Sequence, residues 1–155
     1  MTAPTAEGLA ETLARTLEEA AFIFTEPQSK PPPFRGEVLE ARIAYRGPHA
    51  AELRLTADAG LASTLAANLL GEEEGEASAV RAADAVGELL NMVLGAWVVR
   101  LFGDGRCELG VPQVRRRQAG EAAREAAPPS CAAALVEEQG RRIDLALWLA
   151  PGGRA

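Results

Sequence analysis

The sequence predicts an α+β fold in which an antiparallel or mixed β-sheet is covered by long helices. Apolar residues recur at helical spacing near the start of the chain and again in a long segment over 78–102. Residues 37–45 and 131–148 instead follow patterns typical of strands and hairpins. Such segregated helices and strands favour the α+β class. With 155 residues, the chain is expected to form one domain over 1–155, with its core at about 8–149.

An amphipathic helix is predicted at the start of the chain. Leu9, Leu13 and Leu17 recur every four residues, with glutamates between them. The segment 23–33 contains four prolines, which cannot donate backbone hydrogen bonds and favour extended backbone. We therefore expect 23–33 to be a proline-rich connector outside the core.

A two-stranded hairpin is predicted next. Residues 37–45 alternate with a period of two, and residues 51–55 do the same after a turn at Gly47-Pro48. The side of the first strand predicted to face the core carries Glu37, Leu39, Ala41, Ile43 and Tyr45.

A second helix follows the hairpin, with Asp58 as its predicted N-cap and Gly71 as the residue that ends it. One side of this helix is predicted to carry Leu61, Leu65, Leu69 and Leu70. The acidic run 72–76 is expected to be a solvated loop.

The second half of the chain combines a long helix with strands. The longest helical signal runs over 78–102, and a strand is expected at 107–112. Residues 118–129, rich in Ala, Glu and Pro, predict an insertion loop or a short helix. The apolar runs 131–136 and 143–148 predict a closing hairpin.

Charge and hydropathy exclude several classes of function. Sixteen basic against twenty-two acidic residues give a net charge of −6, which argues against a nucleic-acid partner. No uncharged apolar run approaches the roughly 20 residues of a bilayer span, and no secretory leader pattern is present. A cytoplasmic protein with no membrane partner is therefore expected.

Few residues qualify as nucleophiles or metal ligands. Cys107 and Cys131 lack the paired spacing of a zinc site or a redox motif. His49 is the only histidine, so any Ser-His-Asp or Cys-His site would have to include it. Its position after a Gly-Pro turn is typical of an exposed histidine and argues against catalysis.

The 78–102 helix carries a polar stripe opposite its apolar side. Asp84, Glu88, Asn91 and Gly95 fall on one face, because offsets of three, four and seven residues return to the same side of a helix. The opposite arc, expected to pack on the sheet, contains Val86, Leu90, Val93, Leu94, Trp97 and Leu101. Glu88 and Asn91 are therefore predicted to be neighbours on an exposed surface.

Two interpretations of this stripe remain open. Asn91 is a mediocre helix former, and Gly95 costs about 1 kcal/mol in a helix interior relative to Ala. A partner-docking surface would account for both, because a glycine lets another backbone approach closely. Alternatively, the stripe is a solvated face with an incidental Asn and a Gly needed for internal packing. Periodicity alone does not decide between them.

The stripe contains a family motif. Glu88 and Asn91, within 87–95, resemble the Glu-x-x-Asn signature of CheX-type phosphatases in the CheC/CheX/FliY group. The order of elements also resembles that family over roughly residues 8–149. The matching segments are the strand 51–55, the helix 61–71, the strand segment 110–114 and the two final strands. A CheX-like fold is implied.

The resemblance implies a protein phosphatase for the phospho-aspartate of a CheY-like response regulator receiver domain, in two-component or chemotaxis signalling. Asn91 would orient the attacking water, and Glu88 would contact the receiver's active-site lysine. Asp84 and Gly95 would be partner contacts. The Mg²⁺ needed for the reaction would sit in the receiver, so no cofactor is expected in this chain. The family also implies a homodimer through the sheet.

The sequence departs from the family pattern in two places. Asn68 is preceded three residues earlier by Leu65 and not by an acid, so one signature is present, as in CheX, and not two. Residues 118–129, preceded by three arginines at 115–117, match no family element. The arginines are interpreted as a solvated strand end, with contact to an acidic partner as the other option.

Two other functions fit the same fold. The alternative to a phosphatase is a non-catalytic receiver-docking or signalling adaptor module, although such a surface does not need an acid and an amide at this spacing. A flagellar-switch-like structural subunit is a third option, without an appended domain to support it.

Overall fold

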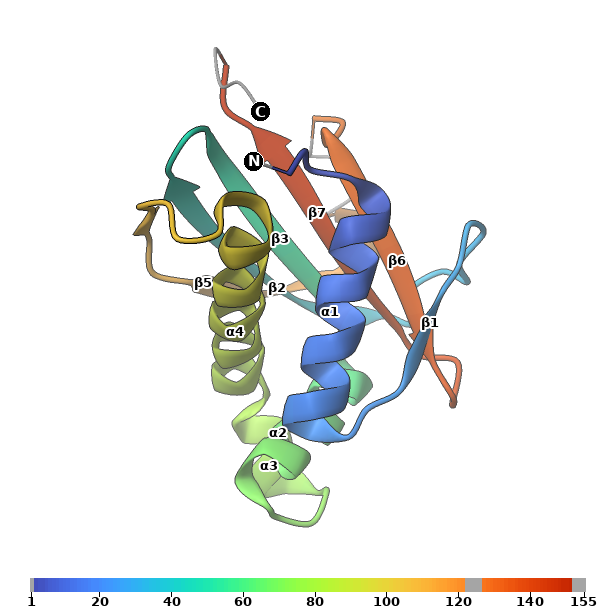
Figure 1. Cartoon of the computed structure of the whole chain (residues 1–155). Helices are drawn as coiled ribbons and strands as arrows, with labels where there is room; N and C mark the ends of the chain where they lie inside the picture. The colour runs from blue at the N-terminus through green and yellow to red at the C-terminus, as the bar shows by residue number, and fades with distance from the viewer. Residues whose placement is uncertain (1, 122–126, 152–155) are drawn as a thin grey trace.

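In the part of the chain that the computed structural model describes, residues 2–121 and 127–151, one sheet is covered on one of its faces by helices (Figure 1). The helices are α1 (Ala6–Ala21), α2 (Ala59–Leu70), α3 (Glu76–Val80) and α4 (Ala82–Phe102). The strands are β1 (Thr25–Pro27), β2 (Glu37–Arg46), β3 (Ala50–Asp58), β4 (Glu108–Leu109), β5 (Gln113–Gln118), β6 (Cys131–Glu137) and β7 (Arg142–Leu149).

The strand order is β1-β6-β7-β3-β2-β4, with β5 also paired to β2, and each pairing is antiparallel. Two hairpins, β2–β3 and β6–β7, meet at the centre of the sheet through β3 and β7. The predicted α+β class and both predicted hairpins are confirmed.

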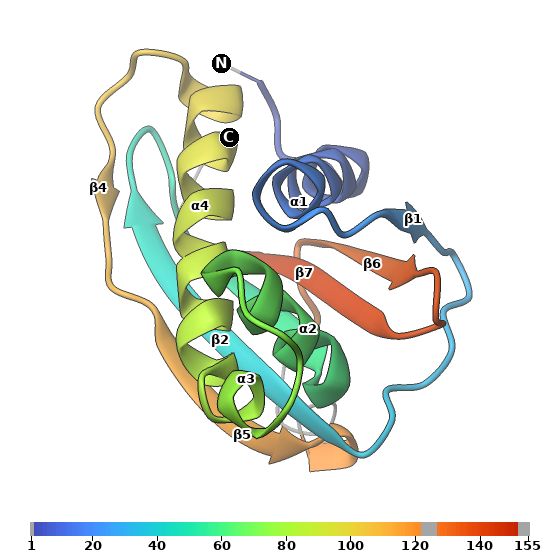
Figure 2. The same cartoon turned by 90° about the horizontal axis from the view of Figure 1, so that it is seen from below.

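The main core lies between the sheet and helices α1, α2 and α4 (Figures 1 and 2). Leu9, Leu13 and Leu17 of α1 are fully buried, as their spacing predicts. On β2, the residues predicted to face the core are 0–3% exposed from Leu39 through Tyr45. Glu37, the first residue of β2, is exposed and does not belong to this set.

The opposite face of β2 is also partly buried, which the alternation does not predict. Glu40 is 4% exposed, and its Oε1 lies 3.0 Å from Nε of Arg115. Nη1 of Arg117 lies 3.6 Å from the other carboxylate oxygen of Glu40. The prediction of a solvated strand end at 115–117 is therefore confirmed for Arg115 and Arg116, which are exposed, and wrong for Arg117, which is buried. The register pairs Glu40 with Arg115 across the strands, and opposite charges at that position attract.

The proline-rich segment is more than a connector. Its residues Thr25–Pro27 form the edge strand β1, which pairs with β6. Ile23, just before β1, is buried in the core. Pro27 is tolerated because an edge strand has one side free of ladder hydrogen bonds.

The long helix predicted over 78–102 is two helices, because the chain turns at Arg81. Ser78 is fully buried, and its hydroxyl lies 2.9 Å from the hydroxyl of Ser63 in α2. The same oxygen accepts a hydrogen bond from the backbone N–H of Gly75. These contacts anchor α3 against α2, so α3 does not continue the axis of α4.

Asp58 precedes α2 but does not cap it with its side chain. Its carboxylate instead accepts hydrogen bonds from the backbone N–H groups of Arg35, at 2.7 Å, and Arg142, at 2.8 Å. Asp58 is 3% exposed. Its role is to join the residues that follow the proline-rich segment 23–33 to the start of β7.

The region between α4 and β6 differs from the single strand predicted at 107–112. Only Glu108–Leu109 forms a strand there, and β5 follows as a separate strand on the same edge. Of the predicted insertion 118–129, Gln118 ends β5, residues 119–121 are helical, in line with the predicted short helix, and residues 122–126 lie outside the described residues. Trp148 of β7 donates its indole N–H to the carbonyl of Ala127 at 2.8 Å.

Helix α4 is long and apolar enough to span a membrane by length and composition, with a mean hydropathy of 1.5. Within its most apolar window, 56% is buried inside the described fold. The core helix of a folded domain passes the same test, and α4 is such a helix.

His49 is buried, at 2% exposure, and not in the exposed turn expected from the sequence. Its Nε2 lies 2.7 Å from the hydroxyl of Tyr45, which also accepts a hydrogen bond from the indole N–H of Trp97. Phe102 packs edge-on against the His49 ring. Burial lowers the pKa of His49 below its usual 6.5 and raises that of Tyr45 to about 12.

This pKa shift predicts a loss of stability in mild acid. Below pH 6.5 the unfolded chain binds a proton at His49 more readily than the folded chain, so the free energy of unfolding falls as the pH decreases. Urea denaturation at pH 7.5 and 5.5 measures this change. His49→Gln, which cannot titrate, should flatten the dependence, and an unchanged slope in that variant would contradict the assignment.

Candidate functional site

The candidate site begins with the way α4 packs. The whole predicted apolar arc is buried, and Trp97, in its middle, is completely covered and bonded to Tyr45. The buried arc residues are Val86, Leu90, Val93, Leu94, Trp97 and Leu101. Because this side is fixed against the core, the opposite side of α4 must face outward.

The outward side carries the predicted stripe. Asp84, Glu88 and Asn91 are exposed, and Gly95 is half-buried, so the structure brings all four residues to one surface. Side chains three residues apart on a helix have Cβ atoms about 5–6 Å from each other, which makes Glu88 and Asn91 neighbours. Within the described chain, neither side chain makes a hydrogen bond or an ion pair. Both are therefore available to an incoming molecule.

The two glycines that flank the motif have different roles. A Cβ placed on Gly95 would meet no atom within 4 Å, so Gly95 is not needed for internal packing. A Cβ on Gly87 would lie 3.3 Å from the Val114 side chain. Gly87 thus sets how closely α4 approaches β5, a role that the sequence reasoning missed. The sequence feature that could have indicated this role is the position of Gly87 on the buried side of the helix.

Two grooves adjoin the stripe at successive positions along α4. One groove, between α2 and α4, has a volume of about 540 Å³ and includes Asp84 and Glu88 in its wall. The other, between α1 and α4, has a volume of about 560 Å³ and includes Gly95. Asn91 is exposed and lines neither groove. A protein surface that covers the whole stripe will therefore extend over both grooves.

Asn68 has a structural role that separates it from Asn91. Its side-chain amide donates to the carbonyl of Ala21 at the end of α1, at 2.7 Å. Leu65, three residues earlier, is buried at 1% exposure. The segment in α2 therefore holds α1 in place and does not form a second exposed acid-amide pair.

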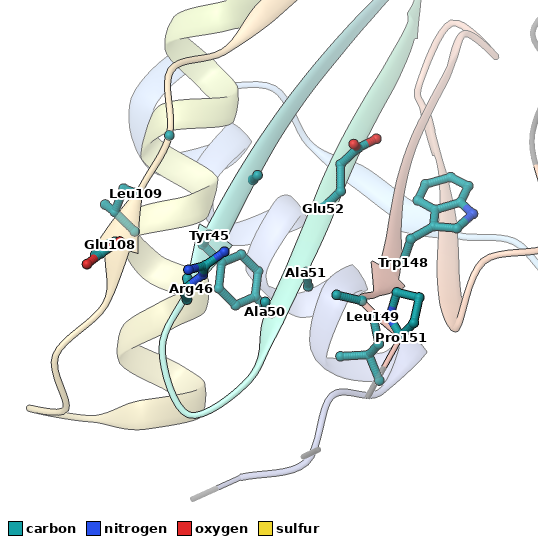
Figure 3. A pocket seen from close by; sticks show the side chains of 13 residues that line it. Tyr45, Arg46, Ala50, Ala51, Glu52, Glu108, Leu109, Trp148, Leu149 and Pro151 are labelled. Atoms are coloured by element: carbon teal, nitrogen blue, oxygen red, sulfur yellow. The ribbon is translucent and has the colours of Figure 1, made fainter. Parts of the chain in front are cut away.

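A larger hollow than these two grooves lies away from the stripe (Figure 3). It has a volume of about 750 Å³ and opens at the end of the sheet where β2, β3, β4 and β7 come together. Glu52 and Trp148 point from neighbouring strands into this region (Figure 3). The carboxylate of Glu52 is paired with Arg54, whose guanidinium stacks 4.4 Å from the centre of the Trp148 ring. The charge of Glu52 is therefore already paired.

Other groups are poor candidates for catalysis. Cys107 and Cys131 are unpaired, and burial raises the pKa of each thiol, which disfavours the nucleophilic thiolate. His49 is buried, and its ring packs against the rings of Tyr45 and Phe102. Over residues 2–121 and 127–151, no three His, Cys, Asp or Glu side chains gather to hold a metal ion.

An exposed carboxylate beside an exposed amide can carry out a limited chemistry. The amide can donate and accept hydrogen bonds and so orient a water molecule without changing its own charge. The carboxylate can hold a cation of a partner. Such a pair suits a reaction whose electrophile is brought by another macromolecule.

The amino-acid sequence of the chain matches a known protein family. Residues 39–134, more than half of the chain and including the whole stripe, match the family described as "Chemotaxis phosphatase CheX". The chain belongs to the CheX family. Among curated proteins, none matches the chain in sequence.

Solved structures share the CheX-like fold. A CheX from Desulfovibrio desulfuricans is 17% identical with a TM-score of 0.67, covering 94% of this chain and 98% of its own. The CheX in a CheX–CheY–BeF₃–Mg complex from Borrelia burgdorferi is 16% identical with a TM-score of 0.69, covering 96% and 99%. FliY from Thermotoga maritima is 16% identical with a TM-score of 0.59, covering 96% and 93%. At these identities the likeness is one of fold.

Proposed function

We propose that this CheX-family chain hydrolyses the phospho-aspartate of a CheY-like response regulator receiver domain in chemotaxis or another two-component pathway. The observation that carries the proposal is the pairing of Glu88 and Asn91 on an exposed face of α4, where neither side chain has a hydrogen-bond or ion-pair partner in the described chain. Membership of a family described as chemotaxis phosphatases supports it. So does the fold shared with a CheX that is bound to CheY.

Each residue of the pair has a separate task in this mechanism. Asn91 would hold a water molecule in line with the phosphorus, with its amide N–H and C=O fixing the orientation of the water. Glu88 would bind the active-site lysine of the receiver and position the two proteins. Mg²⁺, held by the receiver, would neutralise charge on the phosphoryl oxygens. Asp84 and Gly95 would complete the contact surface.

The expected oligomer and location are further parts of the proposal. A homodimer formed through the sheet and a cytoplasmic location stay predictions. Size-exclusion chromatography with light scattering measures the first directly.

The decisive experiment is phosphate release from a panel of phosphorylated CheY-like receiver domains with Mg²⁺ present. Faster release from one or more receivers in the presence of the chain is the expected result. Binding to a receiver without faster release would favour the docking or adaptor module instead. Absence of both binding and release would reject both functions.

Gly95→Ala tests whether the stripe contacts a partner. Because the new methyl group meets open space, the helix should gain about 0.5–1 kcal/mol of stability from the better propensity of alanine. If a receiver backbone approaches Gly95, the same methyl group should raise KM for the receiver. Thermal denaturation and receiver titration measure the two effects. A stabilised variant with unchanged KM would remove Gly95 from the contact surface.

A further inference from the structure

The groove between α2 and α4 is an apolar hollow directly beside the candidate motif, and we refer to it as the α2–α4 groove. Its volume of about 540 Å³ is enough for one or two large side chains. Its walls include Leu69, Leu70, Arg81, Asp84, Glu88 and Met92. The carboxylate proposed to hold the receiver lysine is therefore also a wall of this groove.

Leu70 gives the groove an exposed apolar wall. The sequence groups Leu70 with the buried leucines of α2, but its side chain is 47% exposed. Leu61 and Leu65 are buried at 1%, because they follow the four-residue spacing that Leu70 breaks. Leu70 is the last residue of α2, and the left-handed Gly71 ends the helix there. A large apolar side chain at this position contributes little to the core and faces a possible partner.

The rim of the groove is acidic. α4 contributes the carboxylates of Asp84 and Glu88 to its wall, and the acidic run 72–76 follows α2 in the sequence. The one basic residue in the wall, Arg81, lies with its Nη1 3.2 Å from the Glu72 carboxylate, which offsets its charge. The groove is therefore complementary to a surface that combines a basic group with an apolar side chain.

The groove between α1 and α4 lacks these properties. Its acids Glu11 and Glu19 are balanced by Arg15 and Arg100. The guanidinium of Arg100 lies 2.8 Å from the Glu11 carboxylate and bridges the two helices. This groove has no charge preference that would select a basic partner surface.

We propose that the α2–α4 groove is the recognition groove for the receiver: it takes an apolar side chain that neighbours the active-site lysine, and Leu70 and Met92 determine affinity. This inference rests on the proposed phosphatase function and adds the surface that selects the receiver. Continuity supports it, because Glu88 cannot reach a lysine on a partner without the partner covering the adjoining groove. The apolar wall would contact the apolar side chain of the receiver, and the acidic rim would attract its lysine.

The test compares Leu70→Ala with Leu109→Ala. Leu109, in β4, is a matched control because it is 51% exposed and lies outside the groove. The probes are a panel of CheY-like receiver domains, phosphorylated for turnover and loaded with beryllofluoride and Mg²⁺ for binding. Losing a buried leucine contact should raise both KM and Kd about tenfold for Leu70→Ala, with kcat at saturating receiver changed less than KM.

The possible results distinguish a failure of the recognition-groove proposal from a failure of the phosphatase proposal. A weaker Kd for Leu70→Ala but not for Leu109→Ala supports the groove, whether or not the wild type releases phosphate. Equal Kd values for wild type and both variants would overturn the proposal that the α2–α4 groove binds the receiver. The proposed phosphatase function would be unaffected. Absence of receiver binding by the wild type overturns both. Met92→Ala should weaken binding in the same direction, and an unaffected Met92 variant would limit recognition to Leu70.

Discussion

Replacing Asn91 with alanine is expected to lower kcat for receiver dephosphorylation by about a hundredfold, because water loses the group that holds it in line with phosphorus. KM should change little, since Asn91 acts mainly on the water in the transition state and not on docking. The side chain is exposed and makes no hydrogen bond within the described chain, so the free energy of unfolding should stay within about 0.5 kcal/mol of wild type. Single-turnover phosphate release and urea denaturation measure these quantities.

Glu88→Ala is the matched comparison for the Asn91 variant. Glu88 is also exposed on the same stripe, but its proposed task is to hold the receiver lysine. When Glu88 is truncated, KM should therefore rise and kcat should fall. Wild-type turnover in Asn91→Ala would contradict the mechanism, even if Glu88→Ala were impaired.

Asp58→Ala is expected to cost about 3 kcal/mol of stability, because two backbone N–H groups lose a charged acceptor within the fold. The carboxylate is 3% exposed and bonds Arg35 and Arg142 at 2.7 and 2.8 Å. Its loss should loosen both the connector and the start of the central strand β7. Urea denaturation followed by circular dichroism gives the change in the free energy of unfolding.

Asp104→Ala is the control for Asp58→Ala. Asp104 is exposed in the turn after α4, and its replacement should change stability by less than about 0.5 kcal/mol. Equal losses in the two variants would show that the Asp58 hydrogen bonds do not contribute as proposed.

The stripe illustrates what local spacing can predict. Helical geometry relates residues three, four and seven positions apart, whatever the rest of the fold does. The burial of Trp97 and the exposure of Glu88 and Asn91 follow from that relation. The groove beside them does not, because its other wall, Leu70, belongs to a different helix.

The sequence alone determined the periodicities: which face of α1 and α4 is buried, the two hairpins and the exposed acid-amide pair. Only the tertiary structure decided which distant groups meet. Asp58 bonds a backbone N–H 84 residues away, and Glu40 pairs with Arg115 across 75 residues. These contacts depend on strand order and register, which arise when the whole sheet is assembled. Periodicity within a segment specifies its faces but not its neighbours.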